Sequence, residues 1–275
     1  MSGTLYVVGT PIGNLGDISP RALETLEKCD FIAAEDTRVT LKLLNRFEIK
    51  KPMVSYFEHN RFERGPVIAE RLLLGENCAL VTDAGMPAIS DPGEDLVKLC
   101  IEKGIKVESV PGPCAFATAL AVSGMPSRRF SFEGFLPVEK SARREHISWL
   151  IGETRTMIFY EAPHKLSQTL RDLADALGDR EIAIVRELTK IHEQVIRTTL
   201  CAAAQKYSEE ELKGEIVLII GGAQPKEKES MTLEQAVEYA RELADGGESK
   251  TQAAKLAAKE SGFKKGEIYK LLIEE

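Results

Sequence analysis

The sequence lacks the cysteine pattern of a disulfide framework or a structural zinc site. Its 275 residues hold five scattered cysteines and no Cys-x-x-Cys pair. Small secreted domains need an even, closely spaced set, and zinc sites need paired ligands. We therefore expect no disulfide framework, no metal site and a reducing cytoplasmic location. The residues concerned are Cys29, Cys78, Cys100, Cys114 and Cys201, with His59, His146, His164 and His192 at no metal-like spacing.

The chain also lacks a long apolar run and an excess of positive charge. We expect no membrane-spanning segment and no secretory signal, because neither apolar pattern is present. The formal net charge of -7 excludes a globally basic nucleic-acid coat. A local excess remains possible, since eight basic residues face four acidic ones between Arg38 and Arg71, and a second basic group spans Arg128 to Arg144. These groups suit RNA phosphates, although ordinary solvated helix faces also explain many of them.

What the sequence does have is an alternation of strand-like and helix-like segments. Strands are expected at residues 5–9, 30–36, 77–85 and 106–113, with helices between them. The first such helix has Ser19 as its cap and Pro20 in its first turn. This rhythm predicts an α/β protein with a mostly parallel sheet.

Beyond Gly124 the strand-like segments lie closer together, and a mixed sheet is expected. A hydrophobic content of 43% is enough for two such cores. We predict an N-terminal α/β domain at 1–124, a second α/β domain at 125–223 and a helical appendage at 224–275. A polar linker at 223–230 joins the second domain to the helical part, which starts at Met231.

Three Gly- and Pro-rich loops follow expected strands of the first half. They read GTPIGNLGD, TDAGMPAISDPG and VPGPCA. Open α/β sheets bind ligands at the carboxyl ends of their strands, and glycine lets a ligand approach the main chain. One such loop would be interpreted as a tight turn, but three predict a shared cleft.

The glycine spacing does not match the common nucleotide fingerprints. Gly9, Gly13 and Gly16 do not form G-x-G-x-x-G, and no lysine completes a P-loop. The acidic-x-G-x-G-x-G loop of common Rossmann methyltransferases is also missing. The residues alone therefore leave the ligand open.

Eight motif blocks together resemble one known family. They are LYVVGTPIGNLGDISPRALETL, AAEDTR, ALVTDAGMPAISDPG, SVPGPCA, FEGFLP, YEAPH, RELTK and KGEIVLIIGG, in order from Leu5 to Gly222. The chain is similar to the ribosomal RNA small subunit methyltransferase I family, within the tetrapyrrole-methylase-like superfamily.

The resemblance implies two α/β domains with S-adenosylmethionine in the cleft between them and no metal. It implies methylation of the ribose 2′-oxygen of a cytidine in the decoding centre of 16S rRNA. The expected partners are the small ribosomal subunit and a second copy of the chain, with neither DNA nor membrane.

The resemblance also implies a set of donor-binding residues. Asp83 would accept a hydrogen bond from the donor's ammonium or lie near its sulfonium, although an N-cap or Asx-turn also explains an aspartate at this position. Cys114 is interpreted as a small packing residue rather than a nucleophile. The full set is Pro11, Ile12, Asp83, Ala84, Gly85, Met86, Cys114, Ala115, Tyr160, Glu161, Ala162 and Leu188.

Acceptor chemistry is expected at AAEDTR. A ribose hydroxyl is a poor nucleophile, so it needs a general base or a pre-aligned, desolvated site. Glu35, Asp36 and Arg38 are the catalytic candidates, with Arg38 holding a phosphate. An Asp helix cap with an Arg ion pair explains the same residues equally well. Lys190 and His192 are further candidates for a base or a phosphate contact.

Two other functions remain open at this point. One is a methyltransferase of the same fold acting on a tetrapyrrole ring, and the other is a ribosome assembly factor without catalysis. The basic tail after Ser249 reads as a helix, a turn at Gly262 and a second helix. It suits a role in gripping the substrate, in stabilising a dimer or in capping.

Overall fold

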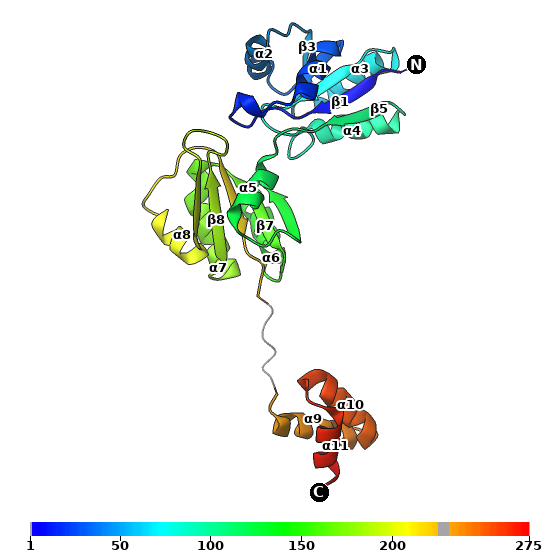
Figure 1. The fold of residues 1–275 in the computed structure, drawn as a ribbon, viewed down its shortest axis with the longest axis vertical. Helices are drawn as coiled ribbons and strands as arrows, with labels where there is room; N and C mark the ends of the chain where they lie inside the picture. The colour runs from blue at the N-terminus through cyan, green and yellow to red at the C-terminus, as the bar shows by residue number, and fades with distance from the viewer. Residues whose placement is uncertain (1, 225–230, 275) are drawn as a thin grey trace. The chain divides into compact units, whose positions relative to one another are not determined.

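The computed structural model describes residues 2–224 and 231–274, and its contacts divide the chain into two compact units. The first comprises residues 1–223 and the second residues 224–275 (Figure 1). The first unit contains two β-sheets, as expected for this α/β fold. Most of the expected polar linker at 223–230 lies outside the described residues.

The first sheet is entirely parallel, with strand order β3-β2-β4-β1-β5. Its central strands β2 and β4 are buried on both faces, which is why their sequences are continuously apolar. The strands are β1 (Thr4–Val8), β2 (Phe31–Ala34), β3 (Met53–Ser55), β4 (Cys78–Val81) and β5 (Lys106–Val110).

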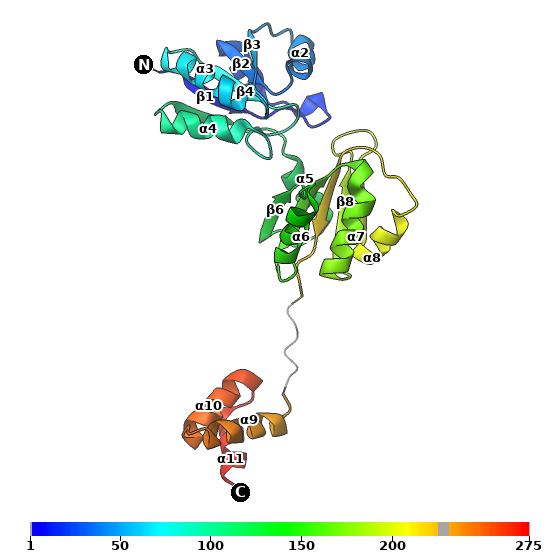
Figure 2. The ribbon, with the colours of Figure 1, turned by 180° about the vertical axis from the view of Figure 1, so that it is seen from behind.

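Helices cover both faces of this sheet. One face carries α1 (Pro20–Lys28) and α2 (Thr37–Arg46), whose residues share a core with Ile32 and Val81. The other carries α3 (Arg61–Leu73) and α4 (Gly93–Glu102), seen in front of the sheet in Figure 2. The expected cap is confirmed, because the Ser19 side chain accepts a hydrogen bond from the Ala22 N–H and Pro20 begins α1.

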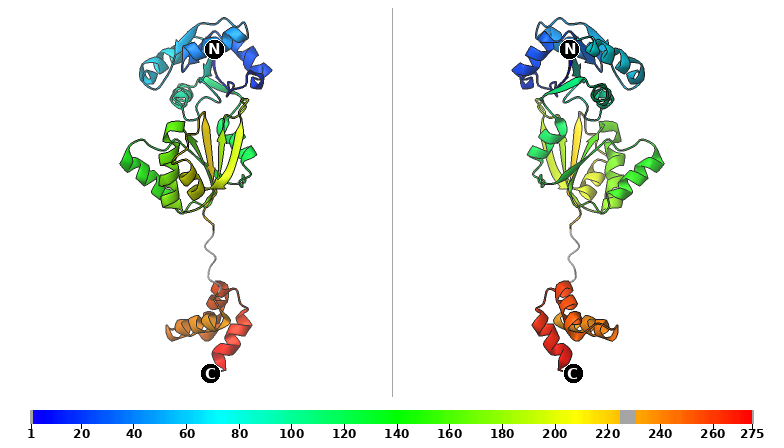
Figure 3. Two further views of the ribbon diagram at one scale, coloured as in Figure 1. Left: turned by 90° about the vertical axis from the view of Figure 1, so that its left-hand side faces the viewer. Right: turned by 90° about the vertical axis from the view of Figure 1, so that its right-hand side faces the viewer.

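The second sheet is mixed, as the sequence predicts. Its order is β6-β7-β10-β8-β9, with β6 parallel to β7 and the remaining pairs antiparallel. Helices lie on both of its faces (Figure 3). The elements are β6 (Phe130–Gly134), α6 (Lys140–Trp149), β7 (Thr156–Glu161), α7 (Leu166–Leu177), β8 (Glu181–Arg186), β9 (Gln194–Thr199), α8 (Leu200–Lys206) and β10 (Ile216–Ile220), with short 3-10 turns η1 (Leu15–Asp17) and η2 (Pro163–Lys165).

Helix α5 (Ala115–Ser123) packs on the second sheet rather than on the first. Its Ala119 and Leu120 share a buried cluster with Ile158 of β7 and Val185 of β8. Arg197 of β9 also donates hydrogen bonds to the carbonyls of Val122 (2.6 Å) and Ser123 (2.8 Å) at the end of the helix. The chain therefore passes between the sheets at residues 111–114. The boundary predicted at residue 124 coincides with the end of this helix, whose C-cap is Gly124.

The described residues of the second unit, 231–274, form a bundle of three helices, α9 (Leu233–Asp245), α10 (Lys250–Ser261) and α11 (Lys265–Ile273). Its core is built mainly from alanines, with Ile268 and Leu272 from α11. Small side chains allow the helices to pack closely. The expected turn is confirmed, because Gly262 takes the left-handed conformation that ends α10.

A glycine pair holds the loops after β1 and β5 together. A Cβ on Gly9 would lie 2.6 Å from the Gly112 Cα, and a Cβ on Gly112 would lie 2.8 Å from Gly9 backbone atoms. The loop after β4 joins them, because Thr10 and Gly85 exchange backbone hydrogen bonds of 2.9 and 3.1 Å. Only glycine allows this approach, which fixes the loops that form the site.

We expect Gly9→Ala to destabilise the first unit by about 1–3 kcal/mol, because the added methyl group meets rigid backbone. Urea unfolding measures the change. Gly152→Ala is the matched control, since a Cβ there meets nothing within 4 Å. Equal stability of the Gly9 and Gly152 variants would contradict the close approach.

Candidate functional site

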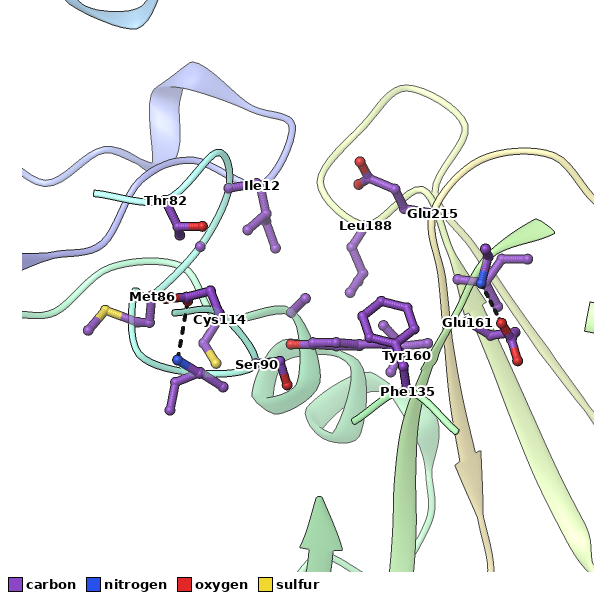
Figure 4. A pocket seen from close by; sticks show the side chains of 18 of the residues that line it. Ile12, Thr82, Met86, Ser90, Cys114, Phe135, Tyr160, Glu161, Leu188 and Glu215 are labelled. Atoms are coloured by element: carbon purple, nitrogen blue, oxygen red, sulfur yellow. Dashed lines mark hydrogen bonds between the residues drawn. The ribbon is translucent and has the colours of Figure 1, made fainter. Parts of the chain in front are cut away.

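A cavity of about 440 Å³ lies between the loops of the first sheet and the strand ends of the second. This volume is in the usual range for small-molecule sites. Figure 4 shows Ile12, Thr82 and Met86 on one side and Leu188 and Glu215 on the other. Ten of the predicted donor-binding residues line it, namely Ile12, Ala84, Gly85, Met86, Cys114, Ala115, Tyr160, Glu161, Ala162 and Leu188.

Aromatic side chains form one wall of this cavity, which we call the donor cavity after the predicted donor-binding residues that line it. The Tyr160 hydroxyl accepts a hydrogen bond from the Phe116 N–H at 3.2 Å. Its ring centroid lies 5.0 Å from that of Phe132 and 5.6 Å from that of Phe135. Figure 4 shows the Phe135 side chain beside Tyr160. Burial raises the pKa of Tyr160 to about 12, so the hydroxyl stays neutral at physiological pH. The wall therefore offers flat apolar surface with a neutral polar tip.

The loop that carries Leu188 has an unusual backbone. Both Glu187 (φ 52°) and Thr189 (φ 65°) take the left-handed conformation. Such conformations persist only where neighbouring contacts enforce them. Here the Lys190 ammonium lies 2.9 Å from the Glu187 carboxylate and 3.3 Å from that of Glu215. These ion pairs fix the loop that places Leu188 at the cavity. They also engage the ammonium group of Lys190, which was considered from the sequence as a base.

Several cavity residues were not predicted as site residues. Asp91 is held there by its own turn, because its carboxylate accepts hydrogen bonds from the N–H groups of Ala88 (3.0 Å) and Gly93 (2.8 Å). Phe135, which follows β6, also lines the cavity. Val185 of β8 lines it together with Leu188. The motifs AISDP and FEGFLP contain Asp91 and Phe135, but spacing alone does not indicate that these segments meet.

Carboxylates gather where β2 and β4 end. The Glu35 carboxylate accepts a hydrogen bond from the Thr82 hydroxyl and lies 3.4 Å from the Asp83 N–H. The Asp83 carboxylate in turn accepts a hydrogen bond from the Asp36 N–H at 3.1 Å. Burial raises the pKa of Asp83 above its ordinary value, and the negative charge of Glu35 raises it further. Asp83 therefore holds a proton more readily than a solvated aspartate.

Asp36 and Arg38 form the helix cap and ion pair considered as the alternative interpretation. Asp36 is the N-cap of α2 and accepts from the Arg38 N–H at 2.8 Å. The Arg38 guanidinium lies 2.6 Å from the same carboxylate and keeps the pKa of Asp36 at about 2. An aspartate held so strongly in its charged form is a poor base near neutral pH. The Arg38 side chain is 87% exposed and faces solvent.

A second cavity of about 270 Å³ adjoins the first. Thr82 lines both cavities at the end of β4, and we refer to this shared position as the junction. Pro11 and Asp83, both predicted to contact the donor, line this second cavity and not the first. Glu35 lines the donor cavity, whereas Asp36 and Arg38 line neither. His192, the other base considered, is exposed at the surface.

The described part of the chain holds neither a metal-ligand cluster nor a membrane-spanning helix. In residues 2–224 and 231–274, no group of three or more His, Cys, Asp or Glu side chains is placed to hold a metal ion. No helix within the same residues has the length and hydropathy needed to cross a bilayer.

Comparisons with known proteins show the family to which the chain belongs. The family model described as Tetrapyrrole (Corrin/Porphyrin) Methylases matches residues 4–204. A Synechocystis protein named Ribosomal RNA small subunit methyltransferase I is 46% identical over 273 residues, which cover 99% of this chain and 98% of the relative. The chain belongs to the ribosomal RNA small subunit methyltransferase I family. The resemblance noted from the motif blocks is thus confirmed.

A relative from Thermotoga maritima with the same name is 48% identical over 220 residues. These cover 80% of this chain but 99% of the relative.

Solved structures of low sequence identity share the fold. Uroporphyrin-III C-methyltransferase from Thermus thermophilus, complexed with S-adenyl homocysteine, matches with a TM-score of 0.56 and 18% identity, over 80% of this chain and 97% of its own. Diphthine synthase matches with a TM-score of 0.59 and 14% identity, over 80% and 90%. The predicted fold class is confirmed.

The two aspartates at the strand ends predict opposite effects of pH on stability. The raised pKa of Asp83 means that the free energy of unfolding falls as pH rises from 3.8 through that higher value. We therefore expect Asp83→Asn to be more stable than the wild type at pH 7. The asparagine oxygen still accepts from the Asp36 N–H, and the gain vanishes below pH 3.8.

Asp36→Asn is the matched comparison. The lowered pKa of Asp36 stabilises the fold above pH 3.8, and this contribution is lost as pH falls through about 2. We expect this variant to be less stable than the wild type at pH 7. Urea unfolding from pH 2 to 8 measures both differences. The same sign for both variants at pH 7 would contradict this electrostatic account.

Proposed function

We propose that the protein transfers a methyl group from S-adenosylmethionine to the ribose 2′-hydroxyl of a cytidine in the decoding centre of 16S rRNA. The observation that carries this proposal is that Thr82 lines two cavities, with Glu35 lining the first and Asp83 the second. A donor in one cavity and an acceptor in the other would then both reach Thr82, as direct methyl transfer requires its two reactants close together.

The donor cavity fits S-adenosylmethionine in size and lining. Tyr160, Leu188 and Val185 offer apolar surface for a flat adenine ring, and Gly85 brings main chain to the wall. Acidic side chains at Glu35, Asp91 and Glu215 suit a ligand with positive ammonium and sulfonium groups. When bound, S-adenosylmethionine supplies a methyl group activated by its sulfonium.

The acceptor side is assigned to the junction. Asp83 lines the second cavity, and its raised pKa makes its carboxylate a better proton acceptor than an ordinary aspartate. It would take the proton of the ribose hydroxyl as the oxygen bonds to the methyl carbon. Glu35 would position the Thr82 hydroxyl and the Asp83 main chain. Arg38, exposed at the start of α2, would bind an RNA phosphate.

The names of the relatives favour ribosomal RNA over a tetrapyrrole as the substrate. The fold alone does not, because structural neighbours of the same fold include tetrapyrrole methyltransferases. A second copy of the chain and a cytoplasmic location follow from the family resemblance and remain predictions.

The direct test is methyl transfer from labelled S-adenosylmethionine to purified small ribosomal subunits that lack the modification. Free 16S rRNA and a uroporphyrinogen-type ring are assayed beside them. We expect label in an alkali-resistant dinucleotide, because a 2′-O-methyl group blocks alkaline cleavage. Asp83→Asn should lower kcat by about 10²–10⁴-fold while donor affinity is kept. Label on the ring alone, or donor binding without transfer, would contradict the proposal.

A second prediction concerns the donor cavity alone. Ala115 lines it at the start of α5, whereas Ala117 is exposed on the same helix. We expect Ala115→Phe to weaken S-adenosylmethionine binding at least about tenfold in calorimetry, because the ring fills the cavity. Ala117→Phe should bind like the wild type. Equal affinities of the two variants would place the donor elsewhere.

A further inference from the structure

The second cavity has features of a binding site in its own right. It lies between the loop after β1, which includes Pro11 and Leu15, and one side of helix α2. At about 270 Å³ it is smaller than the donor cavity and small for a drug-sized ligand. It suits a single nucleoside rather than a large macrocycle.

The sides of this cavity are apolar although they face solvent. Leu15 is 45% exposed and Val39 is 38% exposed, and Leu43 of α2 lies beside them. Exposed apolar side chains around a concave surface often mark a ligand site. A nucleobase has two flat, weakly polar faces, and enzymes that act on an extruded nucleotide hold it between apolar side chains.

The lining of the cavity also includes polar and charged groups. Thr82 and Asp83 are at the junction with the donor cavity, and Lys42 is in the wall formed by α2. These groups suit the parts of a nucleotide. The base would lie among the apolar side chains, the ribose at Asp83 and a phosphate at Lys42.

Helix α2 extends the positive charge beyond the cavity. Arg38, Lys42 and Arg46 are four residues apart, so they share one face of the helix. Arg38 is paired with Asp36. In contrast, Lys42 and Arg46 form no ion pair with any residue that the structure describes. A row of cations beside the apolar second cavity suits an RNA strand. The cations would neutralise the phosphates, and the apolar side chains would contact the base.

We propose that the second cavity binds the target nucleoside of the RNA, extruded from its stack, and that Lys42 and Arg46 bind the flanking phosphates. This inference rests on the proposed methyl transfer to a ribose. It adds that Val39 and Leu43 hold the base, so that the 2′-hydroxyl faces Asp83 and the donor cavity.

The test places a large side chain in the second cavity and leaves the lining of the donor cavity unchanged. Leu43→Trp places an indole in the second cavity, and Leu41→Trp places one on the same helix at a position that is 47% exposed and lines neither cavity. We expect Leu43→Trp to lower kcat/KM for small-subunit methylation by about 10²-fold. Leu41→Trp should retain wild-type activity. Both should keep wild-type affinity for S-adenosylmethionine, which shows that they fold.

Val39→Phe is a second, smaller obstruction and should reduce kcat/KM in the same direction. Wild-type methylation by both Leu43→Trp and Val39→Phe would overturn the inference and leave the proposed function intact. Absence of transfer by the wild type itself would instead overturn the proposed function. The two failures are therefore distinguishable.

The phosphate contacts are tested through salt dependence. The double variant Lys42→Ala, Arg46→Ala should reduce the slope of log affinity for the small subunit against log salt by about 2, one for each contact. Lys98→Ala, an exposed lysine on α4, is the control and should leave the slope unchanged. An unchanged slope in the double variant would show that α2 does not bind the RNA backbone.

Discussion

The site depends on a close backbone contact at the carboxyl ends of the parallel strands. Gly9 and Gly112 approach so closely that neither position can hold a side chain, and Thr10 pairs with Gly85 in the loop between them. These contacts join the loops after β1, β4 and β5. Ile12, Gly85 and Cys114 come from these three loops and line one cavity. The parallel sheet provides the strand ends, but the glycines bring the loops together there.

The same strand ends bring together charges of different character. Asp83 lies next to Glu35 with its pKa raised, while Asp36 caps α2 and is kept charged by Arg38. The Asp36 N–H donates a hydrogen bond to the Asp83 carboxylate, yet the two carboxylates differ in how readily they take up a proton. Their environments separate a structural carboxylate from one suited to proton transfer. This contrast makes the junction of the two cavities the best place for the acceptor hydroxyl in our account.

Much of the fold could be predicted because it is encoded locally. Ser19 before Pro20 is sufficient to indicate the start of α1, and apolar strands that end in glycine loops indicate a parallel sheet. The sheet to which α5 belongs could not be predicted in this way. Its sequence AFATALAVS is apolar on all sides, so its pattern indicates no single buried face. The sequence also could not decide between a catalytic and a capping role for Asp36. Only the structure shows that the Arg38 guanidinium donates a hydrogen bond to the Asp36 carboxylate. The second cavity was invisible to motif analysis, since its walls combine the loop after β1 with α2 and the end of β4.

The central claim is that the donor and the target ribose meet at Thr82 and Asp83 from two separate cavities. The most direct measurement is a crystal structure of the protein with S-adenosylhomocysteine and a short RNA that contains the target cytidine. We predict the sulfur in the donor cavity and the cytidine between the β1 loop and α2. The 2′-oxygen should lie near Asp83, within about 3–3.5 Å of the position that the methyl carbon would occupy. A cytidine bound instead beside Phe135 and Tyr160, on the other wall of the donor cavity, would contradict the account.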